Sequence, residues 1–194
     1  MQKIILASGS PRRRELLSGM GLDFEIKVSG IEEEPLAGES PREHALRLAQ
    51  EKALSICASP EAFVIGADTI VIIEGEVLGK PENPGQAREM LQKLSGRTHQ
   101  VITGYSIVRN QEVLVSEAVE SSVVFNNISE EELTWYIKTS EPYDKAGAYA
   151  MQGIGAVFIR EIHGSFTNVI GLPLAELAKS LRTVGALRLE DLRV

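Results

Sequence analysis

The stretch AFVIGADTIVII, residues 62–73, is apolar at nearly every position and rich in β-branched side chains. Such a run predicts a strand that is buried on both faces, as in the middle of an α/β sheet. Gly66, Asp68 and Thr69 interrupt the apolar run. A buried carboxylate is costly unless it pairs with a cation, binds a metal or acts as a base, so Asp68 is a candidate functional residue. The alternative is that Asp68 lies at the end of the strand and caps a neighbouring turn.

Strand and helix signals alternate on both sides of this run. Further strands are expected at residues 3–8, 23–29, 77–78, 100–108, 112–125 and 156–162. Helices are expected to begin near residues 11, 41, 84, 130 and 173, and the second is expected to continue to about residue 58. The sequence Arg-Asn-Gln at residues 109–111 predicts an antiparallel hairpin turn. This order predicts a single α/β domain, residues 1–194, with a mixed and strongly twisted sheet.

The composition is ordinary for a soluble protein. The 194 residues include 27 acidic and 20 basic side chains, for a net charge of −7, which argues against non-specific nucleic-acid binding. No apolar run is long enough to span a membrane, and the first residues predict a strand and not a signal peptide. Cys57 is the only cysteine, which excludes an internal disulfide and a cysteine-based zinc site. A reducing cytoplasm is the expected setting.

Three consecutive arginines, Arg12, Arg13 and Arg14, occupy the first turn of a predicted helix. Ser10 is a suitable N-cap, and Pro11 fits the first helical position. Cations at this end of a helix oppose its dipole and cost about 0.3 to 1 kcal/mol each. A bound phosphate would explain them, because free backbone N–H groups, the dipole and the guanidinium groups would all point at it. The alternative is a solvated basic turn.

Lys52 lies near the centre of an apolar stripe on the helix predicted from residue 41. The other members of this stripe are Ala45, Leu48, Ala49, Ala53 and Ile56. A lysine that faces a core needs an anionic partner or a ligand. The alternative is that its side chain snorkels to the surface along its own stem.

Three further features are ambiguous on their own. Lys80, in LGKPENP, is compatible with an ordinary exposed lysine, and the glutamates at 32–34 are compatible with a solvated acidic run. One of these glutamates could bind Mg²⁺ together with Asp68 and phosphate oxygens. The segment EPYDKAGAYAMQGIGA, residues 141–156, is rich in glycine around Gln152, which allows a ligand to approach the backbone closely. Walker A, dinucleotide-binding and metalloprotease motifs are absent from the sequence, which leaves carboxylate and metal chemistry on a phosphate substrate.

Several of these segments together resemble the Maf (septum-formation inhibitor) family of nucleoside triphosphate pyrophosphatases. In chain order they are SGSPRRRELL (8–17), IEE (31–33), LAQEKA (48–53), GADT (66–69), LGKP (78–81), SGRTHQVITG (95–104), EPYDKAGAYAMQG (141–153) and GSFTNVIGLP (164–173). The resemblance covers essentially the whole chain. It implies an elongated mixed sheet flanked by helices, similar to the inosine triphosphate pyrophosphatase fold, with the nucleotide in a central cleft.

The resemblance also implies which residues line that cleft. They are Ser8, Arg12, Arg13, Glu33, Lys52, Asp68, Lys80 and Gln152. By the same resemblance, Asp68 accepts the proton, and Arg12, Thr69 and Gln152 select the substrate. Asp68 and Glu33 would hold Mg²⁺ or Mn²⁺. Because Glu33 stands in EEE where the family more commonly has an Asp-Glu pair, each glutamate of this run is a candidate for the metal.

The implied reaction is hydrolysis of the α,β bond of a nucleoside triphosphate, which gives the monophosphate and pyrophosphate. Asp68 would activate the attacking water. Arg12, Arg13, Lys52 and Lys80 would stabilise the charge that develops on the phosphates. The metal would bridge phosphate oxygens.

The loop that carries Gln152 resembles the branch of the family that acts on dTTP and UTP. A sister branch, which acts on 7-methyl-GTP, typically has glutamate at this position. The family further suggests a homodimer, and its role would be to remove unwanted or modified nucleotides before polymerases use them. The alternative from another functional class is a nucleotide-binding regulator of cell division, for which hydrolysis is incidental.

Overall fold

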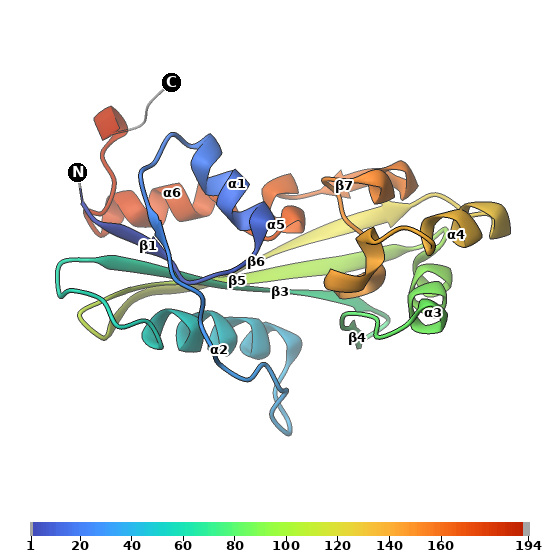
Figure 1. Cartoon of the computed structure of the whole chain (residues 1–194), viewed down its shortest axis with the longest axis horizontal. Helices are drawn as coiled ribbons and strands as arrows, with labels where there is room; N and C mark the ends of the chain where they lie inside the picture. Colours follow the sequence, from blue (N-terminus) through green and yellow to red (C-terminus); the bar gives the residue numbers. More distant parts are fainter. Residues whose placement is uncertain (1, 192–194) are drawn as a thin grey trace. The chain divides into compact units, whose positions relative to one another are not determined.

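The computed structural model describes residues 2–191 and has the predicted mixed α/β architecture, with helices flanking a sheet (Figure 1). The strands are β1 (Ile4–Leu6), β2 (Glu25–Ile26), β3 (Phe63–Ile73), β4 (Glu76–Leu78), β5 (Thr98–Arg109), β6 (Glu112–Phe125) and β7 (Ile159–His163). The helices are α1 (Pro11–Gly19), α2 (Pro41–Leu54), α3 (Pro84–Leu94), α4 (Glu130–Tyr136), α5 (Phe166–Ile170) and α6 (Leu174–Thr183). Short 3₁₀ helices are η1 (Glu141–Asp144), η2 (Ala146–Ala148), η3 (Ile154–Phe158) and η4 (Leu189–Asp191). Within residues 2–191, no helix is long and apolar enough to cross a membrane.

The strand order is β2-β1-β3-β5-β6-β7, and β4 pairs with β3. Strand β1 runs parallel to both β2 and β3, whereas the β3–β4 and β6–β7 pairs are antiparallel. The sheet is therefore mixed. Parallel pairing at β1 follows from the helical connections, because α1 joins β1 to β2 and parallel neighbours need a crossover.

The chain divides into two compact units, and each is described by itself. Unit 1 comprises Met1–Asp68, Thr103–Val119 and Gly171–Val194, and unit 2 comprises Thr69–Ile102 and Glu120–Ile170. Strands β3, β5 and β6 each contribute residues to both units. The expectation of one domain over residues 1–194 stays a prediction.

In unit 1, α2 covers one face of the strands, and α1 and α6 cover the opposite face (Figure 1). A buried cluster formed by α2, β1, β3, β5 and residues next to their ends is apolar, and its members are small or β-branched. They are Ile5, Ala7, Ala53, Ile56, Ala62, Val64 and Val108. Burial of this set removes apolar surface from water and stabilises the layer contact.

Glycines in the two central strands let α2 lie directly on the sheet. A Cβ atom at Gly66 of β3 would lie 2.1 Å from the Ala49 carbonyl oxygen and 2.8 Å from the Ala53 nitrogen. A Cβ atom at Gly104 of β5 would lie 2.4 Å from the Ala45 carbonyl oxygen. These distances are shorter than any real side-chain contact, so only glycine fits at either position. The small residues on the helix stripe serve the same close approach.

Unit 2 has its own core, built from β3 to β6, α3, α4 and the loops that follow. Its larger members include Leu91, Leu94, Phe125, Leu133, Tyr136, Tyr149 and Phe158. His99 is buried among them, with Nε2 2.7 Å from the Tyr149 hydroxyl and its ring edge-on to Phe125. Burial lowers the pKa of His99 to about 4, so the imidazole is neutral at pH 7.

Local hydrogen bonds set several element boundaries where the sequence predicts them. Asn83 caps α3, since its side chain accepts from Gln86 N at 3.0 Å. Ser40 and Ser129 each begin a capping box, at α2 and at α4. Strands β5 and β6 are neighbours in the sheet and are joined by two residues, Asn110 and Gln111, with φ of 51° and 62°, which confirms the predicted hairpin turn.

Helix α2 ends at Leu54, earlier than the predicted residue 58. The Ser55 hydroxyl donates to the Lys52 carbonyl at 2.8 Å. In a continuing helix that carbonyl would accept from Ile56 N, which instead donates to Ala53 at 3.3 Å. A serine side chain that takes a backbone acceptor ends the helix here.

Two predicted strands are wrong in extent. The segment 154–158 forms a 3₁₀ helix, so the strand predicted from residue 156 begins only at Ile159. The strand predicted at residues 23–29 is limited to Glu25–Ile26, since only these two residues pair with β1, and Val28 beyond them is 68% exposed. The sequence analysis also missed α5, because one helical turn is too short to show a periodic pattern.

We expect Gly66→Ala to lower the free energy of unfolding by about 1–3 kcal/mol or more, because the added methyl group overlaps the α2 backbone. Urea unfolding followed by circular dichroism measures this loss. Gly30→Ala is the matched control, since a Cβ atom there meets nothing within 4 Å, and we expect a change within about 0.5 kcal/mol. Equal unfolding midpoints for wild type and Gly66→Ala would contradict the close approach.

Candidate active site

The Lys52 ammonium lies between two carboxylates in unit 1. Its Nζ is 2.7 Å from Asp68 Oδ1 and 2.7 Å from Glu33 Oε1. Lys52 and Asp68 are 5% and 8% exposed, whereas the Glu33 side chain is 47% exposed. The Lys52 side chain therefore does not extend to the solvent, and the buried Asp68 carboxylate is paired with a cation. Of the three glutamates in the acidic run, Glu33 is the one whose contact with Lys52 is established.

The packing of α2 on β3 creates this ion pair. Asp68 lies two residues after Gly66, so both lie on the same face of the strand. Lys52 lies on the α2 stripe with Ala49 and Ala53, the two residues that approach Gly66 most closely. The close contact of α2 with Gly66 therefore also brings the Lys52 side chain to the Asp68 carboxylate.

Arginines line the start of α1, as the sequence predicts. The first turn contains no acidic residue, and Arg13 Nη1 donates to Ser8 Oγ at 3.2 Å. Arg13 Nε donates to the Gly171 carbonyl at 2.8 Å, which fixes the direction of the guanidinium. Ser10 is the N-cap residue but its side chain makes no capping bond, and its N–H donates to Ser8 Oγ at 3.2 Å. Ser8 is buried and serves both neighbours.

The arginine turn and the ion pair share one electrostatic environment. Burial lowers the pKa of Arg13, while the charge of Asp68 acts in the opposite direction, Arg12 lowers it further and Glu33 raises it. The guanidinium stays charged at neutral pH. Three cations and two carboxylates therefore act together within unit 1, and the cations are in excess.

The carboxylates of Glu33 and Asp68 are suitable ligands for a divalent cation. Both carboxylates converge on the Lys52 ammonium, each with one oxygen 2.7 Å from Nζ. Among the described residues 2–191, no group of three or more His, Cys, Asp or Glu could hold a metal on its own. Mg²⁺ usually takes one or two carboxylates, substrate phosphate oxygens and water, and the donors present fit that pattern.

The other three predicted site residues belong to unit 2. Thr69 follows Asp68 directly in β3 and is half-buried, and Lys80 and Gln152 are exposed. The Gly147 N–H donates to the Gly79 carbonyl at 3.1 Å. This bond ties the loop that carries Lys80 to the glycine-rich loop 141–156 within unit 2.

The sequence analysis missed Glu141, which organises the loop that carries Gln152. Its carboxylate accepts from Ile154 N and Gly155 N at 2.8 Å each, and from the Tyr136 hydroxyl at 2.8 Å. A Cβ atom at Gly153 would lie 2.3 Å from this carboxylate. These two N–H groups are the first of η3 and both donate to one carboxylate, beside a glycine that leaves room for it, so the Gly-Ile-Gly spacing is the signal that the sequence offers.

The Maf-like protein family model matches residues 3–184 of the chain. The chain is 53% identical over 188 residues to the dTTP/UTP pyrophosphatase of Syntrophus aciditrophicus, covering 96% of this chain and 92% of the relative. It is 49% identical over 187 residues to the dTTP/UTP pyrophosphatase of Geobacter sulfurreducens, covering 95% and 98%.

Among solved structures, the nucleoside-triphosphatase, or dITP/XTP pyrophosphatase, of Mycobacterium abscessus aligns with a TM-score of 0.42 at 17% identity, over 94% of this chain and 97% of that one. The Ham1 protein of Staphylococcus aureus aligns with a TM-score of 0.44 at 16% identity, over 66% and 73%. Since the family model and relatives of about 50% identity both span nearly all of the sequence, the chain belongs to the Maf-like family.

Proposed function

We propose that this chain is a nucleoside triphosphate pyrophosphatase that hydrolyses dTTP and UTP to the monophosphate and pyrophosphate. The names of its relatives support this reaction. The observation that carries it is the buried Lys52 ammonium held between Asp68 and Glu33, close to the arginines of α1. Such a group of aimed cations and carboxylates fits a small polyanion whose hydrolysis needs both charge stabilisation and a base.

The positive end of α1 binds the triphosphate in this proposal. Arg12 and Arg13 extend from the first helical turn, where backbone N–H groups and the helix dipole also favour anions. The bond from Arg13 to Ser8 holds the guanidinium in place before the substrate arrives. Guanidinium groups bind phosphates through paired hydrogen bonds, which fixes orientation as well as charge.

Asp68 acts as the base that takes a proton from the attacking water. It lies on a strand whose backbone is fixed by pairing and by α2, so its carboxylate has little freedom to move. Lys52 holds Oδ1, and the second oxygen orients the water towards the α-phosphorus. Lys52 then stabilises the negative charge that develops on the phosphates.

Glu33 and Asp68 would hold the divalent metal, Mg²⁺ or Mn²⁺, together with phosphate oxygens. The metal supplies Lewis-acid polarisation of the phosphate. Thr69, Lys80 and Gln152 receive their roles from the family resemblance, with Lys80 as a further phosphate contact and Thr69 and Gln152 in substrate selection. The cytoplasmic setting and the homodimer likewise stay proposals that rest on the resemblance and on the substrate class.

Hydrolysis of dTTP in ¹⁸O-labelled water tests the proposed reaction. The cations of α1 and Lys52 can hold a departing pyrophosphate, so the water should attack the α-phosphorus in line with that leaving group. Mass spectrometry should find the label in dTMP and none in pyrophosphate. Label in pyrophosphate would mean attack at the β-phosphorus, and release of dTDP with orthophosphate would mean an ordinary γ-phosphatase. Either result overturns the proposal.

We expect Asp68→Asn to lower kcat for dTTP by about 10²-fold or more, the usual scale for loss of a general base. Thermal stability should change little, because the amide oxygen can still accept from Lys52. The measurements are pyrophosphate release at saturating dTTP and the midpoint of thermal unfolding. Asp23→Asn, at an exposed position in unit 1, is the control and should keep wild-type turnover. Turnover near that of wild type in Asp68→Asn would remove Asp68 from this role.

Gln152→Glu tests base selection. An amide can both donate to and accept from a pyrimidine edge, where an N–H lies between two carbonyls, whereas a carboxylate only accepts and repels those carbonyls. We expect kcat/KM for dTTP and UTP to fall by about tenfold or more relative to 7-methyl-GTP, a loss typical of one mismatched polar contact. Gln92→Glu, on the exposed face of α3, makes the same charge change and should leave the preference unaltered. An unchanged ratio in Gln152→Glu would mean that other groups read the base.

A further inference from the structure

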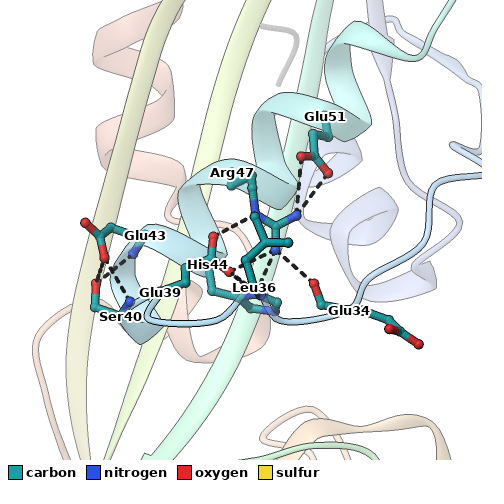
Figure 2. Close-up of polar contacts among 8 residues, drawn as sticks. All are labelled: Glu34, Leu36, Glu39, Ser40, Glu43, His44, Arg47 and Glu51. Atoms are coloured by element: carbon teal, nitrogen blue, oxygen red, sulfur yellow. Dashed lines mark hydrogen bonds and ion pairs between the residues drawn. The ribbon is translucent and has the colours of Figure 1, made fainter.

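The Arg47 side chain of α2 joins the helix to the loop that precedes it (Figure 2). Its Nε and Nη2 donate to the Glu39 carboxylate at 2.6 and 2.9 Å, and Nη2 also donates to the Glu34 backbone carbonyl at 2.9 Å. Nη1 lies 3.2 Å from Glu51 Oε2, one turn further along the helix. One guanidinium thus holds two points of the loop against α2.

Glu39 is the acceptor at the centre of this cluster (Figure 2). Besides Arg47, its carboxylate contacts His44 Nδ1 at 3.0 Å and accepts from Leu36 N at 3.2 Å. Hydrogen bonding from Arg47 lowers the pKa of Glu39 to about 2, so the carboxylate is charged at neutral pH. The capping box at Ser40 fixes the next residue of the chain. Glu39 is therefore tied to both the loop and the helix.

The segment 27–40 has no helix and no strand, only a turn at residues 37–38. Its position depends on side-chain anchors, because no ladder of backbone hydrogen bonds holds it. Glu33 lies in this segment, directly before the residue whose carbonyl Arg47 binds. Although its side chain is about half exposed, Glu33 reaches the buried Lys52 ammonium at 2.7 Å.

We propose that Arg47 is a positioning residue, which together with Glu39 anchors the segment 34–39 on α2 so that Glu33 reaches Lys52. This inference rests on the proposed function, in which Glu33 takes part in the reaction. Arginine suits the role because its planar fork donates to a carboxylate and to a carbonyl at once, which a lysine ammonium cannot do in the same geometry. Groups that orient a ligand residue typically change metal affinity or activity by about 10–100-fold when removed.

The simplest competing explanation is that Arg47 only stabilises α2 through Glu51. A purely structural role would lower the fraction of folded enzyme, and it would do so equally whether or not Glu33 is present. A double-mutant cycle between Arg47 and Glu33 separates the two explanations, since coupled residues give non-additive losses.

The first measurement needs no substrate and no metal. Hydrogen exchange of the Leu36 backbone amide, which donates to the Glu39 carboxylate at 3.2 Å, is compared between wild type, Arg47→Met and Arg42→Met. Arg42 is an exposed arginine on the same helix that donates to the Ala118 carbonyl, so it matches the change in charge and helix. We expect exchange of the Leu36 amide to be at least about tenfold faster in Arg47→Met and unchanged in Arg42→Met. Equal protection in all three proteins would overturn the anchoring.

The second measurement is kcat/KM for dTTP in wild type, Arg47→Met, Glu33→Gln and the double variant. Arg47→Met should lose about 10–100-fold alone and less than about twofold in the Glu33→Gln background. Arg47→Lys should recover part of the loss, because lysine restores the positive charge beside Glu39 but cannot donate to both the Glu39 carboxylate and the Glu34 carbonyl in the same geometry. The same loss in both backgrounds, or no loss with Arg47→Met, would overturn the proposal.

Two results keep this test separate from that of the proposed function. If wild type does not release pyrophosphate from dTTP, the proposed function fails and the role of Glu33 fails with it. If wild type is active and the variants show no coupling, only the positioning role fails. Should Arg47→Met not fold, Glu39→Gln replaces it in both measurements, with the same expected direction and the same overturning results.

Discussion

The contact between α2 and Gly66 of β3 is the constraint on which the proposed site depends. A helix can lie this close to a strand only where the strand has no Cβ atom, since a methyl group would lie 2.1 Å from the Ala49 carbonyl. The approach brings Lys52 over the carboxylate of Asp68, two positions further along the same strand face. A wider spacing between the layers would separate Asp68 from Lys52, and a buried carboxylate that loses its cation costs several kcal/mol. The close packing of α2, which Gly66 and Gly104 both permit, therefore also sets the position of the ion pair.

The ion pair is better explained by function than by stability. Taking two charges out of water costs about as much as their attraction returns, and apolar residues of the same size would fill the space at least as well. In the absence of substrate, Asp68 and Glu33 neutralise Lys52. Glu33 is half exposed and lies in a loop without regular structure, so we expect substrate phosphates to displace it from Lys52 more easily than Asp68. The two carboxylates thus compensate the buried charge of Lys52 until a phosphate group binds to it.

Elements with local causes could be predicted from the sequence. Asn83 and the capping boxes set helix starts through bonds within four residues, and the apolar stripe placed Lys52 on the buried face of α2. The choice of Glu33 among three adjacent glutamates could not be predicted, because it depends on where a loop without regular structure meets a helix far along the chain. The late start of β7 escaped prediction for the same reason, since Glu141 draws the preceding N–H groups out of strand geometry. Contacts between residues far apart in the sequence determine such features, and the secondary-structure propensities of single residues contain no information about those contacts.

Glu39 in unit 1 and Glu141 in unit 2 each hold a loop in place through their carboxylate. Each lies next to a loop that bears a proposed functional residue, and each accepts several hydrogen bonds that would otherwise be supplied by a strand or helix ladder. Burial alone would raise the pKa of Glu141, but the bonds from Gly155, Ile154 and Tyr136 lower it, and the bonds from Arg47 lower that of Glu39 to about 2. A carboxylate whose pKa is lowered on folding stabilises the folded state above its unfolded pKa of about 4.5 and loses that contribution only as the pH falls towards the folded value. Both loops are therefore held by charged anchors throughout the pH range in which a nucleoside triphosphate carries its full negative charge.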